Sequence, residues 1–214
     1  MNFIARFKKV KSGFLNFWKY PLDYKYQGLS DVNRLKDILI IVFLELLILV
    51  PLAFIIDEIQ KIGLLNFPDH KLIDMIDGMS IIRVLFIVVI MAPIIEEVLF
   101  RGFITFQRFY PVLFLIAILG ALGKNKFMAM RVARRLWEIC FPFLVIFSVL
   151  IFGLAHVWNF KELVSLWLIP IAVSPQLVAG LFLTYARVRY GLIWSMMLHA
   201  TVNLTALALH YSIY

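Results

Sequence analysis

Five long apolar runs limit how this chain can fold. They lie at Ile38–Ile56, Ile81–Leu122, Ile139–Trp158, Leu163–Ala186 and from Leu192 to the end of the sequence. A helix of about 20 apolar residues crosses the hydrocarbon core of a bilayer. Hydrophobic residues make up 63% of the chain and charged residues 16%, whereas about a quarter of the residues in a soluble domain are charged. We therefore predict an all-α fold, a polytopic transmembrane helical bundle formed by residues 37–214.

The second of these runs is too long for a single crossing. A helix from Ile81 to Leu122 would extend about 63 Å, whereas the hydrocarbon core is about 30 Å thick. The residue before a proline resists α geometry, so the Tyr110-Pro111 step is the expected break. Val112–Leu122 then either continues a long helix or enters the cytoplasmic face of the membrane as a re-entrant segment.

The distribution of Lys and Arg selects between five and six crossings. With a cytoplasmic N-terminus, five crossings place 17 of the 21 basic residues on the cytoplasmic side. A crossing by Val112–Leu122 would move the five basic residues of the loop expected at Lys124–Arg135 to the outside, which the positive-inside rule disfavours. We predict five spans plus the re-entrant or extended segment, and a six-span version stays open as the alternative.

Residues 1–36 differ from the rest of the chain because they are basic and amphipathic. Apolar residues recur at helical spacing from Phe3 to Trp18, with lysines between them. This pattern favours an N-terminal amphipathic helix in the membrane interface, with a flexible basic tail as the alternative. The net charge of +8 reflects membrane topology and anionic lipid, so we expect lipid partners and no nucleic acid. The chain is expected to be an integral multi-pass membrane protein with its N-terminus in the cytoplasm.

A few charged residues interrupt the apolar runs. Such groups are costly in lipid and usually face a bundle interior or a wet cavity. Glu97 and Arg101 are four residues apart on a predicted helix and can pair on one face. Glu96 lies about 100° around the helix from Glu97 and has no partner in its own segment. Glu45 interrupts the first run, where it either serves the same cavity or bonds to a neighbouring helix.

Two further spans carry polar residues at helical spacing. His156 follows Phe152 by four residues, and Asn203 follows His199 by four, so each pair shares a helix face. Singly, such a His or Asn often makes only an interhelical hydrogen bond, worth well under about 1 kcal/mol. Together with the charged residues above, they form a set of costly groups in three spans that packing alone does not require. The sequence therefore predicts a polar site inside the bundle.

These residues form three motifs in a fixed order: Glu96-Glu97-x-x-x-Arg101, Phe152-x-x-x-His156 and His199-x-x-x-Asn203. In this order and in separate spans, they resemble the motifs of the CPBP family, the CAAX-protease and bacteriocin-processing (Abi) family of intramembrane proteases. The stretch from Ala92 to Gly102 is similar to the first family motif even between its invariant positions. The resemblance implies a protease core at residues 83–206, and residues 1–80 carry no part of it.

The resemblance implies an intramembrane endopeptidase that hydrolyses a peptide bond of a membrane-associated protein or peptide. Glu96 would be the general base that activates a water together with His156. His199 and Asn203 would donate hydrogen bonds to the developing oxyanion. CAAX-type prenylated proteins and bacteriocin-like leader peptides are both candidate substrates, and a bacterial cell membrane is the expected location.

No cofactor is expected, and Glu97, tied to Arg101, would orient the helix that carries the first motif. A zinc-dependent version of the protease stays open, with Glu96, His156 and His199 as ligands. Against zinc, the sequence has no His-Glu-x-x-His motif, and Asn is a poor zinc ligand. Serine and aspartyl chemistries fit worse, because the sequence has no Gly-x-Ser-x-Gly motif and no Asp inside an apolar run.

Two other classes of function stay open: a non-catalytic membrane immunity or scaffold protein, and a proton-coupled transporter with inward Glu and His as a relay. The intact motifs favour the enzyme, whose pocket is expected to open toward the cytoplasm. The depths of Glu96 and His156 in the membrane are not consistent with the simplest topology. Glu96 would lie about 22 Å from the membrane surface at Ile81, and His156 about 25 Å from the opposite surface at Ile139. The two residues meet only if the embedded parts of their helices shift.

Overall fold

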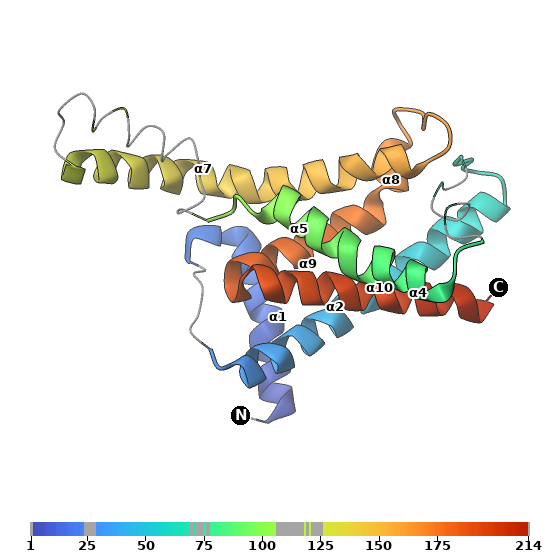
Figure 1. Ribbon diagram of the computed structural model, residues 1–214, viewed down its shortest axis with the longest axis horizontal. Helices are drawn as coiled ribbons and strands as arrows, with labels where there is room; N and C mark the ends of the chain where they lie inside the picture. Colours follow the sequence, from blue (N-terminus) through green and yellow to red (C-terminus); the bar gives the residue numbers. More distant parts are fainter. Residues whose placement is uncertain are drawn as a thin grey trace.

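The computed structural model describes residues 2–23, 29–68, 78–105 and 126–213, together with the single positions 71, 75, 118 and 120. These residues form helices joined by short turns (Figure 1), so the predicted all-α fold is confirmed. The Tyr110-Pro111 step and nearly all of Val112–Leu122 lie outside the described residues. The predicted break and the re-entrant segment therefore stay predictions.

The N-terminal segment forms helix α1 (Phe3–Lys19), in which Asn2 caps the first turn by accepting a hydrogen bond from the Ala5 amide. Its apolar face packs against the bundle. Val10 and Phe17 are buried, and the Phe14 ring stacks on Phe182 with 4.3 Å between ring centroids. The predicted helix is thus present and docked on the bundle, which excludes the alternative of a flexible tail for α1.

Helix α2 (Asp31–Lys61) carries the first apolar run and extends beyond it at both ends. The acidic residues Asp57 and Glu58, which follow the run, therefore belong to the helix. Lys61 holds the last turn because its ammonium group lies 2.6 Å from Asp57 Oδ2 and 3.0 Å from Glu58 Oε1. These pairs are three and four residues apart, the spacings at which helix side chains meet.

The second run begins as one continuous helical segment made of α4 (Ile81–Val84), the π-helical turn η2 (Leu85–Met91) and α5 (Ala92–Arg101). It ends at Arg101, so the predicted option of a helix extended through Leu122 is wrong. Side chains from other helices donate hydrogen bonds to its last carbonyl oxygens. Ser148 donates to the Phe100 oxygen at 2.8 Å, and Arg187 donates to the Arg101 oxygen at 3.0 Å. Carbonyls at a helix end need such outside partners, and here they fix the end point.

Helix α7 (Lys126–Ala155) carries the third run and continues into the short 3₁₀ turn η4 (His156–Asn159). The basic stretch Lys124–Arg135, predicted to be a loop, is helical from Lys126 onward. Lys, Arg, Met and Ala dominate this stretch, and all are strong helix formers. The positive charge that sets the predicted topology therefore lies on the first turns of a long helix.

The fourth run does not form a single helix. After turns around residues 161–168, it forms α8 (Ile169–Ala172) and α9 (Ser174–Tyr190), each of which starts with a proline in its first turn, a position that tolerates the missing N–H. Gly191, with φ of 103°, then turns the chain sharply into α10 (Leu192–Ile213). Only glycine adopts such a conformation readily.

Within the part of the chain that the structure describes, three helices are long and apolar enough to cross a membrane: Asp31–Lys61, Met130–Asn159 and Leu192–Ser212. Helix α9 lies at the centre of the bundle, between α7 and α10, and also packs on α2, while α10 lies along η2 and α5 (Figure 1). The outer faces of α2 and α7 expose large apolar side chains such as Phe43, Phe54, Phe143 and Phe147. Such faces are typical of contact with lipid.

Candidate active site

A buried ion pair forms the base of the site. Arg101 Nη1 lies 2.5 Å from Glu97 Oε1, and both side chains are fully buried, which confirms the pairing predicted from their spacing. The same carboxylate accepts a hydrogen bond from the Ser195 hydroxyl and lies 3.2 Å from His199 Nδ1. Glu97 therefore connects α5 to α10. A buried ion pair with this many partners holds a fixed geometry, because breaking it leaves an unpaired charge in the interior.

Phe152 contacts both the ion pair and the two histidines. The Arg101 guanidinium lies over the Phe152 ring, 4.1 Å from its centroid, a cation–π contact. The ring also meets His156 and His199 edge to face, with centroids 4.7 Å and 5.8 Å apart. Phe152 thus sets the positions of both imidazoles, a role that the spacing in the second motif does not reveal.

The Glu96 carboxylate faces both histidines. Its Oε2 atom lies 3.6 Å from His199 Nε2 and 3.9 Å from His156 Nε2, distances longer than a direct hydrogen bond. This oxygen is buried without a hydrogen-bond partner among the described residues, while the side chain as a whole is 26% exposed. The three groups therefore surround a space that a small polar molecule can fill.

The hydrogen bonds of the imidazoles determine which ring nitrogens can act on that space. His156 Nδ1 lies 2.7 Å from the Phe152 carbonyl oxygen. A carbonyl oxygen only accepts, so Nδ1 carries a proton, and Nε2 is the ring nitrogen that faces Glu96. His199 Nδ1 faces the Glu97 carboxylate, so it also donates, and its Nε2 faces Glu96.

Asn203 lies one turn further along α10 and fixes it to the π-helical turn. Its amide nitrogen donates to the Val88 carbonyl oxygen at 2.9 Å. The amide has a second N–H, which is the one that its predicted role as an oxyanion donor requires. π-Helical turns inside α-helices are rare overall, and those that occur are often found at functional sites.

A cavity of about 720 Å³ joins these groups. Its lining includes the four predicted catalytic residues and Glu45, together with side chains from the later parts of α2 and α10 and from the start of α9: Leu49, Gln176, Ala179, Ala206, Leu207 and His210. The cavity therefore extends toward the end of the bundle where α2, α7 and α10 finish. With a cytoplasmic N-terminus this end lies away from the cytoplasm, so the predicted cytoplasmic opening is inconsistent with the predicted topology.

The sequence model described as type II CAAX prenyl endopeptidase Rce1-like matches residues 78–205. The chain belongs to this Rce1-like family. The match covers all three motifs and confirms the family resemblance. Comparisons with curated proteins and with solved structures found no match. The Rce1-like family points to a protease, and the chain's apolar helices agree with an integral membrane protein.

The conflict in depth predicted for this Rce1-like chain does not occur in the structure. The helix that begins at Ile81 ends beside the last two turns of α7, where Phe100 packs edge to face on Phe152 with centroids 5.5 Å apart. Helix α7 continues past this point toward its basic start (Figure 1). The long α7 therefore accommodates the difference in depth, and Glu96 reaches the level of His156.

Glu45 and Ser195 are fully buried polar residues of the site that lie outside the family motifs. Glu45 is fully buried, lines the cavity, and has no hydrogen-bond partner for either carboxyl oxygen among the described residues. Of the two roles predicted for Glu45, the structure favours the one in which its side chain lines the cavity over the one in which it bonds to a neighbouring helix. Ser195 was not predicted as a site residue, although its position four residues before His199 puts it on the same face of α10.

Proposed function

We propose that this Rce1-like chain is an intramembrane endopeptidase that hydrolyses a peptide bond of a membrane-associated protein or peptide with a water activated by Glu96. The observation that supports it most is the position of the Glu96 carboxylate, which faces the Nε2 atoms of His156 and His199 in one cavity. Peptide hydrolysis needs an activated water, a donor for the oxyanion and a proton for the leaving amine. This set of groups can provide all three.

In the proposed reaction, a water between Glu96 and His156 gives one hydrogen bond to each. Glu96 takes a proton from this water while the oxygen attacks the scissile carbonyl carbon, and His156 Nε2 accepts the second hydrogen bond, which orients the attack. The tetrahedral oxyanion receives an N–H from Asn203 and the Nε2–H of His199. This second donation requires the imidazolium form of His199, because Nδ1 already donates to Glu97. The proton on Glu96 then passes to the leaving amine nitrogen, and the C–N bond breaks.

Glu97 and Arg101 are positioning residues in this proposal. They do not reach the substrate, because both side chains are fully buried. The Glu97 carboxylate instead holds Nδ1 of His199 and the Ser195 hydroxyl, so that α10 presents His199 toward the water. Groups held in advance where charge develops are the largest source of rate acceleration in many enzymes.

A zinc-dependent mechanism is the alternative within the same family. Among the described residues, no group of three or more His, Cys, Asp and Glu side chains is arranged to hold a metal ion. The proposed reaction therefore uses no metal, and Glu96, His156 and His199 would be the ligands in the zinc-dependent alternative. A non-catalytic immunity or scaffold protein remains the alternative outside the enzyme class, and a bacterial cell membrane remains the expected location.

The test is cleavage of a quenched peptide library, including prenylated CAAX peptides, by the purified chain in detergent. We expect Glu96→Gln to lower the rate by about 10³-fold, since a general base contributes about 10²–10⁴-fold. Glu58→Gln is the matched control, because Glu58 is a half-exposed carboxylate on α2 that pairs with Lys61 away from the cavity. An active Glu96→Gln variant would contradict the mechanism. Loss of wild-type activity in a strong chelator, reversed by zinc, would favour the metal version.

We also propose five crossings with the N-terminus in the cytoplasm, on the basis of the positive-inside count. Substrates would then reach the cavity from the side of the membrane opposite α1. An enzyme reporter that is active only outside the cytoplasm, fused after Tyr214, tests this topology. Five crossings predict an active reporter because the two ends of the chain lie on opposite sides, whereas an inactive reporter would favour six crossings.

A further inference from the structure

A second cavity, of about 820 Å³, lies between α1 and the beginning of α2. We call it the α1–α2 pocket. Its lining is Phe3, Arg6, Phe7, Lys9, Leu29, Asn33, Lys36, Leu39, Ile40 and Phe43, and it shares none of these residues with the cavity around Glu96. The size is in the range of pockets that bind small molecules, about 300–1,000 Å³.

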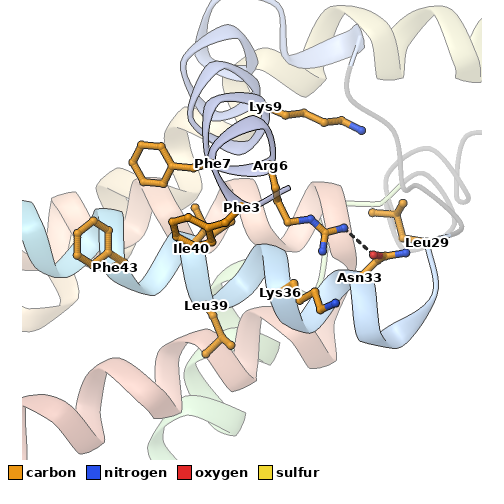
Figure 2. Close-up of a pocket in the computed structure, with 10 residues that line it drawn as sticks. All are labelled: Phe3, Arg6, Phe7, Lys9, Leu29, Asn33, Lys36, Leu39, Ile40 and Phe43. Atoms are coloured by element: carbon orange, nitrogen blue, oxygen red, sulfur yellow. Dashed lines mark hydrogen bonds between the residues drawn. The ribbon is translucent and has the colours of Figure 1, made fainter. Parts of the chain in front are cut away.

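The pocket has a basic half. Figure 2 shows the charged ends of Lys9, Arg6 and Lys36 directed to the same side, where Asn33 lies. Arg6 Nη2 donates to Asn33 Oδ1 at 2.6 Å, and Arg6 Nε lies 3.2 Å from Asp37 Oδ1. Of the three cations, only Arg6 has a carboxylate partner among the ion pairs that the described residues form. The half is therefore positively charged, and two exposed ammonium groups remain to receive an anion.

The other half is apolar and aromatic. The Phe7 ring meets Phe43 edge to face, with centroids 6.3 Å apart, and Figure 2 shows both rings on the side away from the basic groups. Phe3, Leu39 and Phe43 are more than half exposed. Large apolar side chains exposed beside a cavity usually mark a binding surface for an apolar ligand or for lipid.

The two halves follow the order of groups at a membrane surface. Lys36 lies in the charged start of α2, and Phe43 follows it by seven residues inside the apolar run. Seven residues of α-helix extend about 10 Å. The pocket therefore spans the level at which phospholipid headgroups give way to acyl chains, with its basic half at the headgroups.

We propose that the α1–α2 pocket binds an anionic phospholipid of the membrane. The phosphate contacts the ammonium groups of Lys9 and Lys36, and one acyl chain lies against Phe3, Phe7, Leu39 and Phe43. Charge complementarity selects an anion, and the apolar half selects a ligand with a hydrocarbon chain attached to that anion. Bound lipid also joins α1 to α2, and so fixes the N-terminal helix on the bundle.

The experiment uses the full chain in detergent, stripped of lipid and titrated with phosphatidylglycerol or phosphatidylcholine, with bound lipid counted by native mass spectrometry. We expect phosphatidylglycerol to bind more tightly. Lys9→Gln/Lys36→Gln should weaken its binding by about 30-fold, because each basic group near an anionic lipid contributes on the order of 1 kcal/mol. Binding of phosphatidylcholine should change by less than about twofold.

Lys8→Gln/Lys11→Gln is the matched control, since both lysines are exposed on α1 and neither lines the pocket. This control should retain the affinity for phosphatidylglycerol within about twofold. Helix content measured by circular dichroism checks the fold. If the double pocket variant loses helix, Lys36→Gln alone replaces it, with an expected weakening of about fivefold.

Four results would overturn the proposal: equal affinity for the two lipids, an equal loss in the control variant, full displacement of lipid by inorganic phosphate, or tighter binding of an acidic peptide than of phosphatidylglycerol. The third would show a site for soluble anions, and the fourth a site for a protein partner. Leu39→Ser/Phe43→Ser examines the apolar half, and it should weaken phosphatidylglycerol binding as well. None of these readouts depends on peptide cleavage, so failure here is distinct from failure of the proposed protease.

Discussion

The two cavities share helix α2 but hold their charges in opposite ways. Beside Glu96, the cation of Arg101 is paired within the protein: Arg101 and Glu97 form a fully buried ion pair, and Glu97 connects α5 to α10. In the α1–α2 pocket, Lys9 and Lys36 are exposed, and Arg6 retains some contact with solvent. The first arrangement suits chemistry, which needs groups held in fixed positions. The second suits a ligand that brings its own negative charge.

The largest difference between the two cavities should appear in the free energy of unfolding when an ion pair of each is broken. Arg101→Leu leaves the Glu97 carboxylate buried without its cation, so the free energy of unfolding should fall by about 3–5 kcal/mol. Arg6→Gln removes a pair whose side chains are 14% and 12% exposed, and about 1–2 kcal/mol is expected. Unfolding of both variants in the same detergent, followed by circular dichroism, measures the difference. Equal losses would mean that the Glu97 pair is not the tighter of the two.

A smaller effect is expected on catalysis, which only the cavity around Glu96 should support. Asn203→Ala removes one proposed oxyanion donor, which is worth about 3 kcal/mol in a water-poor site, so kcat should fall by about 10²-fold with KM little changed. Thr201→Ala on the same helix is the control, because its hydroxyl bonds only to the Met197 carbonyl oxygen. If Asn203→Ala lowers stability in proportion to activity, its bond to Val88 is its only role.

Much of the fold followed from short-range patterns. The pairing of Glu97 with Arg101 and the helical form of residues 3–19 depend on neighbours within one or two helix turns, which the sequence shows directly. The order of the three motifs was enough to predict which residues line one cavity. Their catalytic roles stay a prediction, because lining a cavity does not by itself show chemistry.

The errors came from contacts between distant segments. The end of the second run at Arg101 depends on Ser148 and Arg187, which lie far along the chain. The basic start of α7, predicted to be a loop from its charge, is helical because its Lys, Arg, Met and Ala residues are strong helix formers. The direction of the cavity is set by the later part of α2 packing with α9 and α10, an arrangement that no local pattern encodes.

The π-helical turn η2 has a consequence for how the first motif can change in evolution. A π turn carries one residue more than the α turn that it replaces, so it accommodates an extra residue that would rotate everything after it by about 100° in a regular α-helix. Deleting a single residue within Leu85–Met91 would therefore convert η2 to an α turn and leave the Glu96 side of α5 facing both imidazoles. A relative with all three motifs and a segment one residue shorter here would keep both the sequence signature and the geometry.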